Sequence, residues 1–338
     1  MKNNEEKTIL ITGVAGLIGS NLSRYLLDRN YNVIGIDNLS GGYKDYVDDR
    51  LITKNQFFEF DLTNEKLLKN LFREYNIDYV YHFAAYAAEG LSPFIRNYNY
   101  TNNILSSVNI INECINFDVK KMIFTSSMAV YGVGSPPFKE SQLPSPIDSY
   151  GVAKYAVEMD LYQANKQFDL KYNIIRPHNI VGVYQNIWDR YRNVIGIWIR
   201  KALNNENLSI YGDGEQTRAF SDIKYYLEIF EKLLYQADNE TFNIGADNYY
   251  KIKDVALIVK KIANKYGYKT ELEFLQPRHE VKEAYCDHEK AKSLLNFVDN
   301  TKLEELVEEM FVWAIKQPNR VVKNMEYEIV KNIYDYWK

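Results

Sequence analysis

Tyr150 and Lys154 are four residues apart, a spacing that places two side chains on one face of a helix. A phenol titrates near pH 10, about three units too high for a good base at neutral pH. A neighbouring ammonium group favours the phenolate, which can take a proton from a hydroxyl while a hydride leaves the same carbon. Tyrosine and lysine recur at this spacing elsewhere in the chain, so the surroundings must select the pair. Tyr150 begins a predicted helix soon after a strand that ends in Thr125-Ser126-Ser127, and parallel sheets bind ligands at such strand ends.

Three glycines, Gly13, Gly16 and Gly19, follow a predicted strand and open a predicted helix. Glycine allows the tight turn and lets a pyrophosphate approach the backbone. The N-terminus of the following helix offers free N–H groups to the phosphates. Although the spacing is GxxGxxG rather than GxGxxG, its position between a strand and a helix predicts a dinucleotide site; the alternative is a tight turn without a ligand.

Asp37 ends the second predicted strand, 18 residues after Gly19. A carboxylate at this position accepts hydrogen bonds from the adenosine ribose hydroxyls and repels a 2′-phosphate. The residues that follow, Asn38-Leu39-Ser40, include no arginine that could hold such a phosphate. The sequence therefore favours NAD over NADP as the cofactor.

These residues stand at the ends of short apolar runs that alternate with helical patterns, which predicts βαβ units around a parallel sheet. The predicted strands are 8–12, 33–36, 56–60, 79–83, 121–125, 172–176 and 241–244. The predicted helices are 18–29, 102–116, 149–168, 194–203, 225–236 and 303–316.

The fold class that follows is α/β: a Rossmann-like, doubly wound parallel sheet with a smaller, interwoven C-terminal α/β lobe that binds the substrate. We expect residues 1–177 to form the NAD-binding domain and 215–245 to return to it. Residues 178–214 and 246–338 are expected to form the substrate-binding lobe, and the chain after residue 244 is expected to be helical.

Composition excludes several classes of protein. The 338 residues are 46% hydrophobic and 25% charged, as in globular proteins. A net charge of −4 argues against a nucleic-acid partner, and no apolar run reaches the ~20 residues that span a bilayer. The segment Met1–Lys7 does not read as a signal peptide, and two cysteines make no disulfide framework. We therefore expect a cytoplasmic protein without a bound metal.

Nearly end to end, the chain resembles the extended short-chain dehydrogenase/reductase superfamily, specifically its NAD-dependent nucleotide-sugar epimerase/dehydratase family of the UDP-glucose 4-epimerase type. The stretches that carry the resemblance are Thr12–Gly19, Asp37-Asn38-Leu39, Asp61-Leu62, His82-Phe83-Ala84-Ala85, Ser126–Gly132, Tyr150–Lys154, Arg176–Gly182, Tyr211–Arg218 and Pro277-Arg278.

The resemblance implies NAD as the cofactor and a nucleotide-diphosphate sugar as the substrate. It implies a catalytic group of Ser127, Tyr150 and Lys154, in which Ser127 holds the reacting hydroxyl. The implied NAD-binding residues are Gly13, Gly16, Leu17, Ile18, Gly19, Asp37, Asn38, Asp61, Leu62, Phe83, Ala84, Ala85, Asn99, Tyr150, Lys154 and His178. The implied substrate-binding residues are Glu89, Ser127, Asn179, Asn193, Tyr211, Arg218 and Arg278, with Tyr211 on the base and the two arginines on the diphosphate.

Three positions depart from the family pattern. His178 stands where relatives usually have an aromatic residue, and a packing role is favoured over a catalytic one. Glu89 puts a carboxylate near the expected sugar, either as a specificity contact or as a helix-start residue. Arg218-Ala219-Phe220-Ser221-Asp222 replaces the usual RDF-x-H run and makes the diphosphate contact less certain.

The function that the resemblance implies is NAD-dependent 4-epimerisation through a transient 4-keto sugar. The alternatives are another nucleotide-sugar oxidoreductase, dehydratase or decarboxylase of this fold, or a non-catalytic NAD-binding sensor. Dehydratase relatives carry an Asp-Glu pair directly after the serine or threonine of the fifth strand, where this chain has Met128 and Ala129. Neither can transfer a proton, which favours the epimerase.

A homodimer is also expected. The helices predicted at 102–116 and 149–168 carry apolar residues on more than one face, and in relatives they form a four-helix bundle between subunits. The apolar residues are Val108, Ile111, Ile115, Tyr155, Val157 and Leu161.

Overall fold

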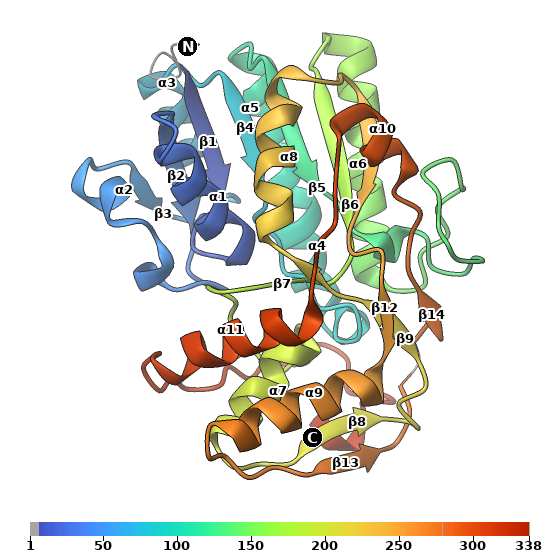
Figure 1. The fold of residues 1–338 in the computed structure, drawn as a ribbon. Helices are drawn as coiled ribbons and strands as arrows, with labels where there is room; N and C mark the ends of the chain where they lie inside the picture. The colour runs from blue at the N-terminus through green and yellow to red at the C-terminus, as the bar shows by residue number, and fades with distance from the viewer. Residues whose placement is uncertain (1–6, 279, 338) are drawn as a thin grey trace.

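A seven-stranded, wholly parallel sheet forms the upper part of the molecule in the computed structural model, which describes residues 7–278 and 280–337 (Figure 1). The spatial order is β11-β6-β5-β4-β1-β2-β3, which confirms the predicted doubly wound α/β fold. Residues 1–6, on which the expectation about a signal peptide mainly rests, lie outside the described part. The strands are β1 (Thr8–Thr12), β2 (Asn32–Asp37), β3 (Phe57–Glu59), β4 (Tyr79–His82), β5 (Lys121–Thr125), β6 (Tyr172–Pro177) and β11 (Glu240–Ile244).

Two layers of helices cover the sheet because successive side chains of a strand point to opposite faces. Ile9 and Ile11 of β1 belong to a core with α1 (Leu17–Leu27) and α8 (Lys224–Tyr235). Leu10, between them, belongs to the core on the opposite face. That second core is formed with α3 (Glu65–Glu74), α5 (Ser106–Asn116) and α6 (Ser149–Phe168).

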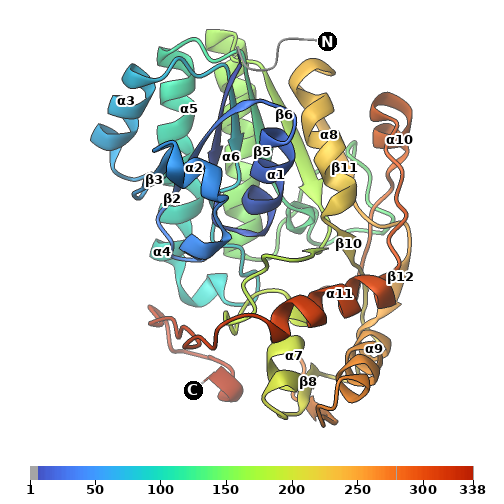
Figure 2. The same ribbon diagram turned by 60° about the vertical axis from the view of Figure 1, so that its left-hand side comes forward.

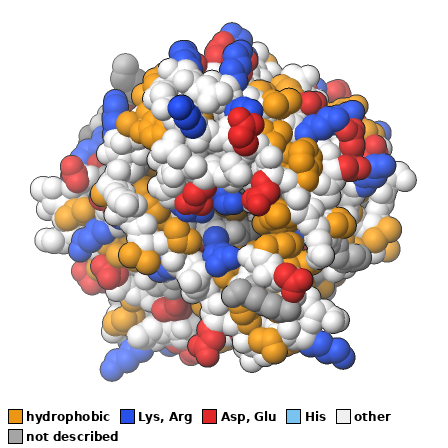
Figure 3. Space-filling model, turned by 90° about the horizontal axis from the view of Figure 1, so that it is seen from below, with side chains coloured by type: hydrophobic (Ala, Val, Ile, Leu, Met, Phe, Trp, Pro, Cys, Tyr) orange, Lys and Arg blue, Asp and Glu red, His pale blue; other side chains and the backbone are white. Residues whose placement is uncertain are grey.

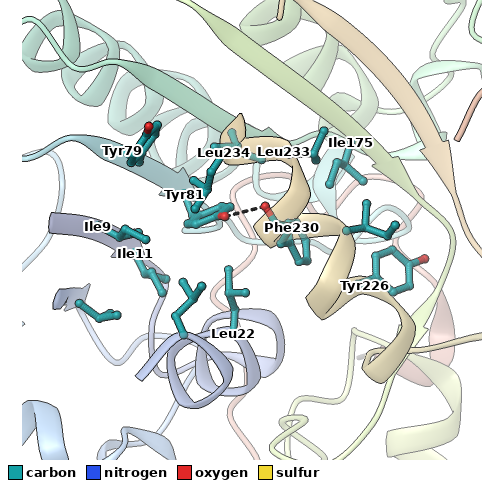
Figure 4. Close-up of a cluster of buried hydrophobic side chains, with 14 of the residues drawn as sticks. Ile9, Ile11, Leu22, Tyr79, Tyr81, Ile175, Tyr226, Phe230, Leu233 and Leu234 are labelled. Carbon is teal, nitrogen blue, oxygen red and sulfur yellow. Dashed lines mark hydrogen bonds between the residues drawn. The ribbon is translucent and has the colours of Figure 1, made fainter. Parts of the chain in front are cut away.

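Figure 4 shows how α8 packs on the sheet. Tyr226, Phe230, Leu233 and Leu234 of α8 lie over β4 and β6. The phenol of Tyr81 on β4 is fully buried and donates a hydrogen bond to the carbonyl of Phe230 at 2.7 Å. The polar end of this side chain is thus satisfied inside an apolar core.

A smaller lobe lies below the sheet (Figures 1 and 2). Its core joins the helices α7, α9 and α11 to the short strand β8. The chain also crosses between the lobes, because α8 and β11 lie with the large sheet and β9 lies in the lower lobe. The elements of the lower lobe and its connections are β7 (Ile180–Val181), α7 (Val194–Leu203), β8 (Leu208–Tyr211), β9 (Thr217–Ala219), β10 (Ser221–Asp222), β12 (Tyr249–Lys251), α9 (Ile252–Lys265), β13 (Leu272–Leu275), β14 (Glu283–Ala284) and α11 (Leu303–Ile315).

Two expectations about local structure are corrected. The helix predicted at 102–116 starts earlier, because α4 (Arg96–Tyr100) runs through a π-helical turn, Thr101–Leu105, into α5. The expectation that the chain after residue 244 is helical is wrong, because three short strands interrupt the helices, and the segment 317–337 contains no α-helix and ends in the short 3-10 helix Asp335–Trp337. The aromatic residues of that segment pack on the loops below the sheet instead of lining one face of a helix. The remaining α-helices of the described residues are α2 (Asp49–Thr53) and α10 (Glu289–Leu295).

Within residues 7–278 and 280–337, no helix combines the length and apolar character needed to cross a membrane. The same residues contain no group of three or more His, Cys, Asp or Glu side chains placed to hold a metal ion.

Candidate active site

One large cavity, of about 1290 Å³, lies between the carboxyl ends of the sheet strands and the lower lobe. Viewed from below, Lys and Arg side chains gather in the hollow near the middle of the molecule (Figure 3). Strand order reverses between β1 and β4, the point at which open α/β sheets bind ligands. Every residue that the sequence assigned to the cofactor or the substrate lines this cavity except Asn99.

The glycine loop after β1 leaves no room for side chains. Gly13 has φ +73°, and a Cβ there would lie 2.8 Å from the backbone nitrogen of Ala84. A Cβ on Gly19 would lie 2.3 Å from the carbonyl oxygen of Gly13. Among the described residues no side chain caps the start of α1, so its first N–H groups remain available to an anion. This cradle fits the pyrophosphate of a dinucleotide.

Asp37, at the end of β2, is held in place by the backbone. Its Oδ2 accepts a hydrogen bond from the Ala15 N–H at 2.9 Å and its Oδ1 from the Leu39 N–H at 2.8 Å. Burial raises the pKa of this carboxyl, and these two hydrogen bonds oppose the shift. Each oxygen keeps a lone pair for a ribose hydroxyl. Asn38 donates to Asp61 at 2.7 Å, which links the two residues expected around the adenosine.

The catalytic group lies where β5 ends and α6 begins. Tyr150 and Lys154 are buried, and a hydrogen bond from Ser127 reaches the Tyr150 phenol. The Lys154 ammonium donates to the carbonyl of Thr125 at 2.8 Å and lies 5.9 Å from the centre of the Tyr150 ring. The side chains of Ser127, Tyr150 and Lys154 therefore lie together in the wall of the cavity.

The expected activation of the phenol by the lysine is not what the protein alone produces. Burial, followed by the negative charge of Glu89, raises the pKa of Tyr150, and the hydrogen bond from Ser127 opposes this. Burial lowers the pKa of Lys154 to about 7, with Glu158 opposing. Both charged forms are penalised because both groups are enclosed. A cation bound beside them would shift this balance towards the phenolate.

Glu89 and Asp148 bring two carboxyls to the cavity beside Tyr150. Glu89 is open to the cavity but enclosed by the surrounding protein, so burial and then Asp148 raise the pKa of Glu89 to about 7. Asp148 is the N-cap of α6 and accepts from the Gly151 N–H at 2.8 Å. Its pKa is raised by burial, against its hydrogen bonds.

The two arginines expected on the diphosphate differ in how far the protein already uses them. Arg218 donates to Glu280 at 2.9 Å and to three backbone carbonyls, those of residues 217, 281 and 282. Arg278 donates from Nε to the Tyr336 hydroxyl at 3.0 Å, and its guanidinium lies 3.4 Å from the centre of the Tyr211 ring. Among the described residues no carboxylate pairs with Arg278.

Three asparagines and a histidine complete the comparison with the expected site. Asn179 and Asn193 line the cavity, and each also donates to a backbone carbonyl. Asn99 is fully buried away from the cavity, where it donates to the Ser149 carbonyl at 2.8 Å and so holds the start of α6. Both ring nitrogens of the buried His178 lack a partner among the described residues, and burial lowers its pKa well below the usual range.

The structure adds residues that the sequence analysis did not assign. Arg192 donates to Gly41 at 3.2 Å, beside the loop after β2, and its charge is paired with Asp189 at 2.8 Å. Asp148 had a sequence signal, an aspartate directly before a predicted helix. The aromatic residues Tyr336 and Trp337 had none, because their contacts span the whole chain.

Comparison with known proteins gives concordant matches. A profile of the NAD dependent epimerase/dehydratase family matches residues 9–245. A putative UDP-glucose 4-epimerase of Methanocaldococcus jannaschii is 31% identical over 318 residues, which cover 92% of this chain and 99% of that protein.

Two solved structures are similar over most of the chain. The UDP-glucose 4-epimerase of Thermotoga maritima with UDP-glucose gives a TM-score of 0.85 at 30% identity, covering 91% of this chain and 99% of that chain. The UDP-glucuronic acid 4-epimerase of Bacillus cereus, with UDP-glucuronic acid and NAD, gives 0.80 at 29% identity with the same coverage.

Proposed function

The chain belongs to the NAD dependent epimerase/dehydratase family and is an NAD-dependent nucleotide-sugar epimerase; from this premise we propose that it inverts C4 of a UDP-sugar through a transient 4-keto sugar. The observation that carries the proposal is that Ser127, Tyr150 and Lys154 face the same cavity as the glycine cradle. A proton-transfer group and a dinucleotide site thus share one enclosed space.

Each residue has a distinct role in the proposed reaction. When bound, NAD⁺ supplies a positively charged ring that accepts a hydride and returns it. Gly13, Gly19 and Asp37 hold the cofactor through the backbone cradle and the ribose hydroxyls. Ser127 orients the 4-hydroxyl of the sugar, and Tyr150 takes its proton and later gives it back.

The cavity wall after β5 favours epimerisation over elimination of water. Met128 and Ala129 line the cavity directly after Ser127 and cannot donate or accept a proton. The carboxyls of Glu89 and Asp148 come from other segments. In the proposed reaction the keto sugar rotates in the cavity, and its other face receives the hydride.

The charge around Tyr150 favours a sugar without a carboxylate. Glu89 and Asp148 are each close enough to raise the pKa of Tyr150 by their negative charge. A uronate would add a further negative charge beside these two carboxyls, in an enclosed space that already disfavours their ionised forms. Of the two substrate types bound by the similar solved structures, we therefore propose that this chain prefers the UDP-glucose type to UDP-glucuronic acid.

A substrate panel tests the proposal. The purified enzyme is incubated separately with UDP-glucose, UDP-N-acetylglucosamine and UDP-glucuronic acid, and products are read by NMR and mass spectrometry. We expect a new C4 diastereomer of unchanged mass, formed fastest from a neutral sugar. Loss of water or carbon dioxide would contradict epimerisation, and fastest turnover of the uronate would contradict the charge argument.

We also propose a homodimer in the cytoplasm. The large apolar side chains that are more than one-third exposed on the expected helices are Leu105, Val152, Met159, Tyr162 and Phe168. Ile111, Val157 and Leu161, expected at the interface, are instead buried within one chain. Light scattering at micromolar concentration tests the dimer, and Met159→Glu should shift the mass towards the monomer.

A further inference from the structure

The segment 317–337 leaves α11 and crosses below the sheet to the loops of the upper domain (Figure 2). Lys323 donates to the carbonyl of Ser40 at 2.9 Å, next to the loop after β2. The Glu328 carboxylate accepts from the N–H groups of Asn97 and Tyr98 at 2.7 and 2.8 Å, at the start of α4. The segment is therefore fastened to the upper domain by specific polar contacts.

The end of the segment fits into an aromatic cluster beside the cavity. Trp337 is 3% exposed and packs against Phe94 and Tyr191, with ring centres 6.0 and 5.3 Å away. The Tyr327 hydroxyl donates its proton to the Trp337 carbonyl and therefore accepts from the Tyr191 hydroxyl at 2.8 Å. A buried tryptophan side chain is costly to remove from its packing, so this anchor holds the neighbouring residue in place.

That neighbour, Tyr336, reaches the two residues expected to meet the nucleotide. Its ring centre lies 4.5 Å from that of Tyr211, and its hydroxyl accepts from Arg278 Nε at 3.0 Å. The Tyr336 carbonyl accepts from Arg190 at 2.9 Å. Tyr336 and Trp337 line the same cavity as Tyr150.

Arg278 has the chemistry of an anion site that the segment completes. The guanidinium is surrounded by the rings of Tyr211, Tyr336 and Trp337 at 3.4, 5.3 and 5.2 Å. Among residues 7–278 and 280–337, Arg278 donates a hydrogen bond only from Nε, to Tyr336, so within this part of the chain the two terminal nitrogens remain for a ligand. Aromatic faces and one hydrogen bond fix the orientation of this cation without neutralising it.

We propose that residues 317–337 form a strap that completes the diphosphate end of the substrate site, with Tyr336 as the positioning residue of Arg278 and Trp337 as the anchor of the strap. The proposal rests on the proposed function, because the ligand that it serves is the nucleotide diphosphate of that substrate. The strap orders Arg278 before the ligand arrives, which lowers the entropic cost of binding.

Calorimetric titration of the NAD-loaded, full-length protein with UDP tests this assignment. Tyr336→Phe keeps the ring and removes the acceptor of Arg278, so UDP should bind about 2- to 10-fold more weakly, the effect of one lost hydrogen bond. Trp337→Ala should weaken UDP binding further, and Trp337→Phe should restore part of the loss. KM for the UDP-sugar should rise while kcat changes little, because the strap does not touch the reacting carbon.

Controls separate the strap from general damage. NAD content and the melting temperature are measured for every variant, and Tyr249→Phe, in an exposed stacked pair on β12 outside the cavity, should leave UDP binding unchanged. Equal or tighter UDP binding by both Tyr336→Phe and Trp337→Ala, with bound NAD intact, would overturn the strap. If the wild-type holoprotein binds no UDP, the proposed function itself fails, and the strap assignment fails with it.

Discussion

The two ends of the cavity are built in different ways. At the cofactor end, the glycine cradle and the N–H groups that hold Asp37 are backbone features of residues 13–39. At the end that we propose for the substrate, the groups are charged side chains from distant segments, among them Glu89, Arg218 and Arg278. Binding at the first end depends on the room that the backbone leaves for a ligand, whereas binding at the second end depends on the charges of side chains.

This difference teaches which perturbation each end should tolerate. A backbone cradle fails when a single carbon is added, because the chain itself occupies the space. A cluster of charged side chains accepts changes in shape but responds to pH and to the removal of one charge. Tyr150 lies between the two ends, so a variant at this residue is the reference with which variants of either end are compared.

The largest effect is expected for Tyr150→Phe. The variant removes the hydroxyl that we propose transfers the proton but keeps the ring, so kcat should fall by about 10²–10⁴-fold. NAD retention and UDP affinity should stay close to those of the wild type, because neither end of the cavity changes. Steady-state kinetics with cofactor extraction checks this, and near-normal turnover would refute the role of Tyr150.

Gly19→Ala should break the cofactor end. Its Cβ would meet the Gly13 carbonyl oxygen at 2.3 Å, and such overpacking costs about 1–3 kcal/mol, so bound NAD should be lost on gel filtration. Gly16→Ala is the matched control, because its Cβ would meet the same oxygen at 3.4 Å and should cause a smaller loss. Equal NAD content in the two variants would show that the room inside the glycine cradle does not limit NAD binding.

Arg278→Gln and Arg218→Gln should separate binding from stability at the substrate end. Arg278 has no carboxylate partner among the described residues, so its loss should weaken UDP binding by about 1.5–3 kcal/mol with little change in melting temperature. Loss of Arg218 removes four hydrogen bonds, one to Glu280 and three to backbone carbonyls, so the melting temperature should also fall. The reverse pattern, measured by calorimetry, would contradict the distinction between the two arginines.

The smallest effect is expected for Glu89→Gln, which should change how the stability of the protein depends on pH. Its pKa is raised from 4.5 to about 7 in the folded protein, so between these values the folded state binds more protons than the unfolded state. Wild-type stability should therefore fall as pH rises through this window, and Glu89→Gln should remove that loss. The melting temperature of Glu89→Gln relative to wild type should rise from pH 4.5 to 7 and then level off.

Glu305→Gln, at an exposed pair on α11, is the control for this measurement and should show no such trend. If the difference in melting temperature between Glu89→Gln and the wild type stayed constant from pH 4.5 to 7, the Glu89 carboxyl would not be in an enclosed environment.

Much of the fold followed from local patterns in the sequence. The strands at 8–12 and 121–125 and the helix at 149–168 were predicted with the bounds that the structure has, because each is a long or strongly apolar run between clear stop signals. The start of the helix that ends at residue 116 differs from the prediction, because the helix contains a π-helical turn. In that turn the Asn103 side chain hydrogen-bonds the backbone N–H and carbonyl of Tyr86, a contact between distant segments that the local sequence does not show.

The sequence by itself determined the sheet, the glycine cradle and the positions of Tyr150, Lys154 and Asp37, because each depends on local spacing and on the ends of neighbouring strands. Only the tertiary structure decided how the side chains interact. Burial, which the four-residue spacing does not show, lowers the pKa of Lys154. Likewise, the contact between Tyr336 and Arg278 spans 58 residues and depends on how the chain crosses below the sheet, which no local pattern encodes.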